Sequence, residues 1–211
     1  MKKIFITLSF FAAFALFTSC SDNFVDDMLD KVDGTGTATI DDSDPVEFPS
    51  SIVMYNKEAK VPCAIGMAMS STLVELLDMD DLDDLKFPVM AYRLIGEKFK
   101  SGANLTVNVT ITDEDLKDFD YKSLLNGKFA DKNVVGIAES EDRFYIMKTG
   151  SIDIKKSTLT KIKGEYSGSA YVISIVDGQA VMENRLVKIE GSFYSRVSPM
   201  FGWLSDLQNE Y

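Results

Sequence analysis

Histidine is missing from this chain of 211 residues. Its absence excludes Ser-His-Asp and Cys-His catalysis in their ordinary forms, because both need an imidazole base. It also excludes zinc, copper and non-haem iron sites that depend on histidine ligands, and an imidazole switch near neutral pH. Paired CxxC, Walker A and GxGxxG patterns do not occur. The sequence therefore predicts neither a cofactor nor a common enzymatic activity.

Cysteine is scarce, with only Cys20 and Cys63 present. If Cys20 is modified as argued below, Cys63 is the only remaining thiol and no internal disulfide can form. Cys63 follows Val61-Pro62 and precedes Ala64-Ile65. We expect it to behave as a small buried hydrophobic residue, because a nucleophilic thiol would need a base nearby.

Basic residues are few: the chain has 22 lysines and arginines and 33 acidic residues, which gives a net charge of −11. Such a chain repels phosphate backbones and anionic headgroups, so nucleic acid is not an expected partner. The densest acidic cluster comprises Asp78, Asp80, Asp81, Asp83 and Asp84. It lacks the glycine and the distant glutamate of a calcium loop, and we interpret it as a solvated helix face.

The first residues have the pattern of an export signal. Lys2 and Lys3 precede an apolar run over residues 4–17, and the small residues Thr18 and Ser19 follow. The run is short for a transmembrane helix, which needs roughly 20 apolar residues. Residues 1–19 are therefore predicted to be a cleaved signal peptide.

The segment Leu16-Phe17-Thr18-Ser19-Cys20 resembles the lipobox of bacterial lipoproteins, in its looser Bacteroidota-type form. The resemblance implies that Cys20 is the lipid attachment site and that a lipid anchor holds the protein on the membrane. It also implies an outer membrane lipoprotein, on the cell surface or on the periplasmic face. An acidic stretch, Ser21 to Asp27, resembles a surface-export signal, with a solvated linker as the alternative. An ordinary secreted protein with a chance cysteine at the cut is the alternative to lipidation.

Composition divides the remainder into two parts. Residues 20–46 are rich in Asp, Gly, Thr and Ser and are predicted to be a flexible acidic tether. Residues 47–211 are predicted to form a single β-rich domain, since this length supports one core of ordinary size.

Alternating apolar residues predict strands through most of this domain. The clearest is residues 105–111, where Leu, Val, Val and Ile alternate with Thr, Asn and Thr. Asp177-Gly178 predicts a hairpin turn between two long strands. Further strands are predicted over residues 52–55, 61–69, 134–138, 144–148, 166–176 and 180–189.

Helical signals are few. A capping box at Thr72-Leu73-Val74-Glu75 predicts a helix that Pro88 ends, and residues 199–207 have the spacing of a short amphipathic helix. Thr112-Asp113-Glu114-Asp115 resembles a helix start. The predicted fold class is mainly β (α+β), an antiparallel β-barrel or sandwich with one or two short helices.

Three glycine-containing runs resemble small β-rich lipoproteins of Bacteroidota. They are Thr149-Gly150-Ser151-Ile152-Asp153-Ile154, Lys163-Gly164-Glu165-Tyr166-Ser167-Gly168 and Lys188-Ile189-Glu190-Gly191-Ser192-Phe193. The resemblance implies a calycin-like or sandwich-like domain with no assigned activity.

Three functions remain open. The first is a membrane-anchored, non-enzymatic module that binds a small ligand, a glycan or an envelope protein. The second is a structural component of an envelope or fimbria-like assembly, and the third is a carboxylate-dependent hydrolase acting on glycans. The aromatic residues Phe193, Tyr194, Phe201 and Trp203 could stack on sugars, although a hydrophobic plug is the favoured interpretation.

Overall fold

The computed structural model describes residues 34–56, 63–70, 87–96, 104–116, 129, 131–158, 161–177 and 179–197. Several predicted features lie outside these residues: the signal peptide, Cys20, the cluster from Asp78 to Asp84, and the helices predicted from Thr72 and over residues 199–207. In the described part of the chain, no helix is long and apolar enough to cross a membrane.

The described residues form one sheet. Its strands are β1 (Thr35–Ile40), β2 (Val46–Phe48), β3 (Ser50–Asn56), β4 (Cys63–Met69), β5 (Val89–Ile95), β6 (Leu105–Thr110), β7 (Val134–Ser140), β8 (Arg143–Ser157), β9 (Lys161–Val176) and β10 (Gln179–Val197). The predicted fold class, mainly antiparallel β, is confirmed.

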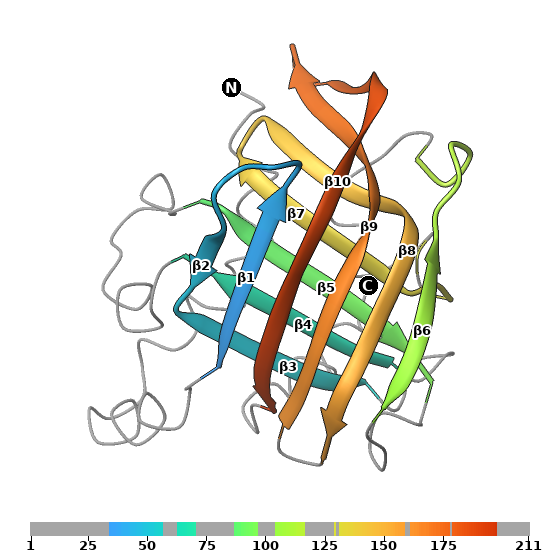
Figure 1. The fold of residues 1–211 in the computed structure, drawn as a ribbon. Helices are drawn as coiled ribbons and strands as arrows, with labels where there is room; N and C mark the ends of the chain where they lie inside the picture. Colours follow the sequence, from blue (N-terminus) through green and yellow to red (C-terminus); the bar gives the residue numbers. More distant parts are fainter. Residues whose placement is uncertain are drawn as a thin grey trace, which may run out of the picture.

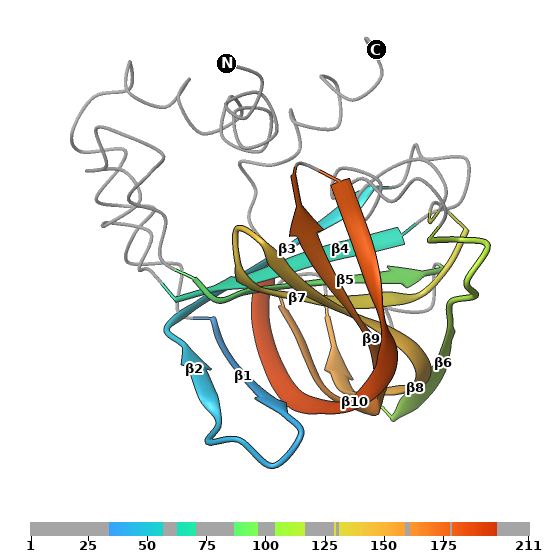
Figure 2. The ribbon, with the colours of Figure 1, turned by 90° about the horizontal axis from the view of Figure 1, so that it is seen from above.

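The sheet closes on itself in a ring. Strands β10, β3, β4, β5, β7, β8 and β9 each pair with the next, and β9 pairs back to β10. All these pairings are antiparallel except β10 with β3, where Arg196 and Val197 run parallel to Ile52 and Val53. Figures 1 and 2 show two crossed layers, β3, β4, β5 and β7 behind β1, β10, β9, β8 and β6. This ring-like sheet is consistent with a sandwich-like or barrel-like fold.

The predicted tether extends too far along the chain. Thr35–Ile40 is strand β1, which pairs along β10 from Tyr194 to Ile189. Its inward positions hold Gly36 and Ala38. Because these side chains are small, the segment lacks the large apolar residues that identify a strand in the sequence, although it lies within the sheet.

The sequence pattern does not predict strand β5. Six of its seven residues are buried, so it lacks the alternation of apolar and polar residues that marks a half-buried strand. Strand β6 shows the opposite case. Thr106, Asn108 and Thr110 are exposed between more buried apolar residues, and the predicted strand is confirmed.

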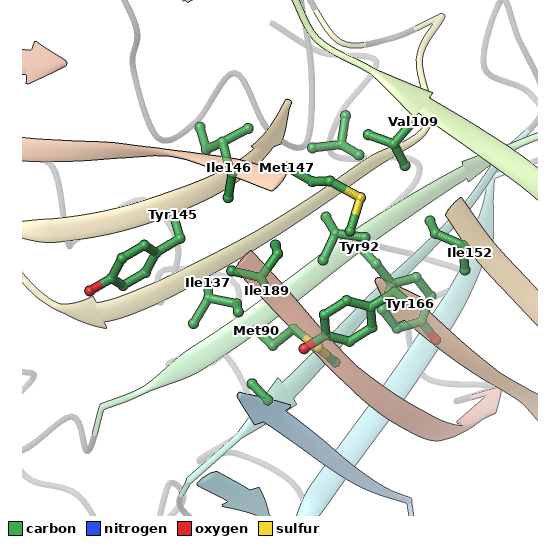
Figure 3. Close-up of a cluster of buried hydrophobic side chains, with 14 of the residues drawn as sticks. Met90, Tyr92, Val109, Ile137, Tyr145, Ile146, Met147, Ile152, Tyr166 and Ile189 are labelled. Atoms are coloured by element: carbon green, nitrogen blue, oxygen red, sulfur yellow. The ribbon is translucent and has the colours of Figure 1, made fainter. Parts of the chain in front are cut away.

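Large aromatic side chains lie over glycines in the interior. The rings of Tyr92 and Phe193 stack with their centroids 4.2 Å apart. Tyr92 covers Gly66, where a methyl group would overlap its ring, and a methyl group on Gly191 would lie 2.5 Å from Oη of Tyr166. Figure 3 shows Tyr92 and Tyr166 within the buried cluster. The glycines therefore provide the volume that the aromatic rings occupy.

The hydroxyl groups of the same tyrosines form hydrogen bonds, between the layers for Tyr92 and within one layer for Tyr166. Tyr92 Oη donates to Ser195 Oγ at 2.6 Å, and the Oγ atoms of Ser195 and Ser51 share a hydrogen bond of 2.6 Å. Tyr166 Oη donates to the carbonyl of Thr37 at 3.1 Å. These bonds satisfy polar groups that would be costly to bury alone, and they fix the rotamers of both tyrosines.

We expect Gly191→Ala to lower the free energy of unfolding by about 1–3 kcal/mol, because the new methyl group would overlap Thr37 and Tyr166 in a filled interior. Urea unfolding followed by circular dichroism measures the change. The control is Gly36→Ala on the neighbouring strand, where the nearest atom is 3.2 Å away. Equal stability of the two variants would contradict the packing described here.

Candidate interaction surface

The interior offers little room for a ligand where Tyr92 of β5 faces Phe193 of β10, because their rings stack with centroids 4.2 Å apart. Within one layer, Phe193 also lies over Gly164 of β9, where a methyl group would lie 2.6 Å from its ring. Met147, Ile152 and Phe193 are themselves fully buried. Since side chains occupy these positions, the exposed surface offers the candidate functional site.

Strands β9 and β10 extend beyond the ring as a hairpin, at the top of Figure 1. The turn contains Asp177 with a φ of 52°, which confirms the predicted Asp-Gly turn. The pairing of β9 with β8 ends at Ser174. In the described part of the chain, β10 pairs only with β9 from Gln179 to Lys188. We refer to residues 174–177 and 179–186 as the projecting hairpin.

This hairpin carries the exposed large hydrophobic side chains of the described residues. They are Val176 (52% exposed), Val181 (47%), Met182 (43%) and Leu186 (50%). A single exposed apolar residue is ordinary in a protein surface, but four on one projecting element are a concentration that indicates an interaction site.

The register places these side chains on both faces of the hairpin. Val181 lies opposite Ser174, so it shares a face with Val176. Met182 lies opposite Ile173, and Leu186 opposite Tyr171, which places both on the other face. A partner that grips the hairpin from either side would therefore meet apolar surface.

A bulge interrupts β10 within the hairpin. Between Met182 and Leu186, three residues of β10 lie opposite the single residue Val172. The bulge contains Glu183, which accepts hydrogen bonds from Arg185 Nε at 2.8 Å and from Ser174 Oγ at 3.1 Å. Bulges and charges at a sheet edge hinder the addition of another strand. The hairpin is therefore suited to side-chain contacts rather than to backbone pairing.

A charged cluster fixes the base of the hairpin. Tyr145 Oη donates to Glu139 at 2.5 Å and accepts from Arg143 Nε at 3.0 Å, while Arg143 lies 3.4 Å from Glu183 of β10. Burial, and then the Glu139 carboxylate, raise the pKa of Tyr145 to about 12. The phenol stays protonated at neutral pH, so Tyr145 does not have the pKa of a catalytic base. The contacts of Arg143 with Glu139 and Glu183 connect the β7–β8 hairpin to the projecting hairpin.

A second cluster joins β8 and β9 to the turn that follows β6. Tyr171 Oη donates to Asp113, and Lys148 Nζ lies 4.7 Å from the Tyr171 ring centroid and 3.5 Å from Asp113. The Tyr171 hydrogen bond lowers the pKa of Asp113, burial raises the pKa of Tyr171, and the Tyr171 hydrogen bond raises the pKa of Lys148. Each pKa moves away from neutrality, which is opposite to the tuning of a general acid or base.

The predicted helix start at Thr112 is a turn over residues 113–116 in the described part of the chain, with the side-chain hydrogen bonds of a capping box. Asp115 accepts from Thr112 N at 2.8 Å, and Thr112 Oγ1 accepts from Asp115 N at 3.3 Å. Lys132 Nζ also lies 2.6 Å from the Asp115 carboxylate. The hydrogen bond from Lys132, and then the bond from the Thr112 backbone, lower the pKa of Asp115 from its ordinary 3.8 to about 2.

Cys63 is buried, as predicted. Arg93 Nη2 donates to its Sγ at 3.3 Å, and the Arg93 side chain is also buried. Burial raises the pKa of the Cys63 thiol, and Arg93 opposes this only in part. A neutral, buried thiol is a poor nucleophile.

The remaining predicted site residues are dispersed. Phe193 is buried against Tyr92, in agreement with a core role, whereas Tyr194 is half-buried with Lys161 Nζ 5.8 Å from its ring centroid. Phe201 and Trp203 lie outside the described residues. Within the described ranges, no group of three or more cysteine and acidic side chains is placed to hold a metal ion.

Comparison of the chain with protein-family models, with curated proteins and with solved structures gives no match.

We expect Asp115→Asn to make the stability of the protein depend less on pH between about pH 4 and pH 2. Because the pKa of Asp115 is lowered on folding, its stabilisation is complete above pH about 4 and is lost as the pH falls towards about 2. Thermal unfolding between pH 2 and pH 7 tests this, with the exposed Asp131→Asn as control. If the Asp115→Asn variant lost stability at low pH as steeply as the wild type, the lowered pKa of Asp115 would be contradicted.

Proposed function

We propose that this chain is a membrane-anchored lipoprotein that acts as a non-enzymatic, partner-binding module at the cell envelope. The observation that carries the proposal is the concentration of exposed apolar side chains on the projecting hairpin: Val176, Val181, Met182 and Leu186. The stack of Tyr92 on Phe193 between the layers supports contact with a partner over capture of a small ligand there.

The lipobox-like segment supports the anchor. With Cys20 acylated, the chain from Cys20 to Gly34 could reach at most about 50 Å, which keeps the sheet near the membrane. The location is then the outer membrane, on the cell surface or the periplasmic face. The small β-rich, calycin-like lipoproteins of Bacteroidota remain the group that the glycine-containing runs resemble.

The titratable groups support a non-enzymatic role. The chain has no histidine, the pKa of Tyr145 lies near 12, and the Cys63 thiol is buried and neutral. No observation among the described residues favours the alternative of a glycan hydrolase.

One observation favours the second candidate, a structural component of an envelope or fimbria-like assembly. In the described part of the sheet, β6 pairs only with β8, in an uninterrupted register from Leu105 to Thr110. The strand contains no charge and no proline, which are the usual protections of an edge. This candidate predicts stable complexes of high mass in mild detergent extracts, and a monomer there would count against it.

We expect Cys20→Ser to release the protein from membranes into the soluble fraction. The thiol is the predicted point of acylation, and serine at that position cannot form the thioether. Mass spectrometry of the native protein should find a chain that begins at an acylated Cys20. An intact Met1, or an unmodified Cys20, would contradict the anchor, and Cys63→Ser serves as the matched control with unchanged fractionation.

We expect a photo-crosslinking amino acid at Val181 or Leu186 to give discrete crosslinked bands in intact cells. The same amino acid at Lys155 or Glu165, which are exposed on β8 and β9 far from the hairpin tip in sequence, should give none. Equal crosslinking at all four positions, or none at the hairpin, would show that the hairpin is not the binding surface.

A further inference from the structure

Carboxylates surround the projecting hairpin. Asp41 and Asp42 lie in the turn after β1, Glu141 and Asp142 lie in the turn between β7 and β8, and Asp177 lies in the hairpin turn itself. All five are exposed. We refer to these five residues as the acidic collar.

Backbone contacts place the collar on both sides of the hairpin. The carbonyl of Asp142 accepts from Ile175 N at 2.8 Å, beside β9. On the β10 side, Asp41 N donates to the carbonyl of Lys188 at 2.7 Å, and Lys188 N donates to the Asp41 carboxylate at 2.9 Å. The collar therefore borders the apolar residues at the base and at the tip.

The nearby positive charges, Arg143, Arg185 and Lys188, are each paired with a carboxylate outside the collar, and Lys188 lies 2.7 Å from Glu190. Arg143 lies 3.3 Å from Glu139 and 3.4 Å from Glu183, and Arg185 lies 2.8 Å from Glu183. None of the five collar carboxylates lies within 4.0 Å of a described lysine or arginine nitrogen. The surface thus combines an apolar centre with an excess of negative charge around it.

We propose that the projecting hairpin binds a protein partner whose contact surface is apolar at its centre and carries lysine or arginine at its rim. The inference rests on the proposed function and adds the chemistry of the partner. Complementary charge at the rim steers encounter and selects the partner, while apolar contact at the centre supplies affinity.

The same features argue against two other occupants. A lipid bilayer would have to accept Asp177, which lies in the turn at the tip, and anionic headgroups would be repelled by the collar. A second copy of this chain would bring two acidic collars together, which costs free energy.

Two short amphipathic peptides with identical leucine positions provide the test, one carrying lysine and the other glutamate at the remaining positions. They are titrated into the mature chain carrying Cys20→Ser, and binding is followed by NMR of the backbone amides. We expect the Leu/Lys peptide to bind, with shifts confined to the hairpin and the collar, and the Leu/Glu peptide not to bind. Raising the salt concentration should weaken binding roughly tenfold, since the Debye length falls to about 3 Å at 1 M.

Two matched variants separate charge from apolar contact. Asp142→Asn with Asp177→Asn removes collar charge, and asparagine tolerates the positive φ at position 177. Val181→Ser with Leu186→Ser removes apolar surface and leaves the charge unchanged. Each pair should weaken binding of the Leu/Lys peptide roughly tenfold, which is the loss expected for about 1.4 kcal/mol.

Four results would overturn the inference. The first is equal binding of both peptides, and the second is chemical-shift changes spread over other strands. The third is undiminished peptide binding by the Val181→Ser/Leu186→Ser variant. The fourth is a change in the hairpin signals on addition of phosphatidylcholine vesicles in place of the peptide. Sedimentation that finds a dimer of the free chain, and a monomer of the Val181→Ser/Leu186→Ser variant, would likewise overturn the inference in favour of a second copy of this chain. In-cell crosslinking at the hairpin is independent of these results, so loss of the basic-partner inference leaves the proposed function separately testable.

Discussion

The packing of aromatic rings over glycines of the neighbouring strand is the constraint on which this structure depends. Tyr92 from one layer stacks on Phe193 from the other, and Gly66 and Gly191 leave the volume that Tyr92 and Tyr166 fill. The hydroxyl groups of these tyrosines then find partners on Ser195 and Thr37. Packing and hydrogen bonding thus fix the same contacts, between neighbouring strands through the glycines and between the layers through Tyr92.

The fold could be predicted where burial follows a simple period. Residues 105–110 alternate because one face is buried and the other exposed, and Asp177 supports a turn that its positive φ requires. Strand β5 is buried at almost every position, so alternation is absent, and β1 faces inward with glycine and alanine. The sequence of either strand does not say which elements pack against its two faces, and the tertiary structure decides this.

The candidate surface could not be predicted for a related reason. Val172 is fully buried while Val176, in the same strand, is half exposed. The residue type is identical, and the difference arises because β8 pairs with β9 only as far as Ser174. Sequence gives the apolar character of a position, but its exposure depends on where a neighbouring strand ends.

The lengths of the strands connect the closed core to the projecting hairpin. Ring closure and the attachment of β1 use β10 only from Ile189 to Val197, whereas Gln179 to Lys188 pairs only with β9 in the described sheet. An isolated two-stranded hairpin is marginally stable in water, so one with exposed valine, methionine and leucine needs support. The Glu139–Arg143–Glu183 cluster and the filled core below provide it. For the partner binding proposed above, this rigid base would hold the apolar side chains in place in the free protein, which would reduce the entropy lost on binding.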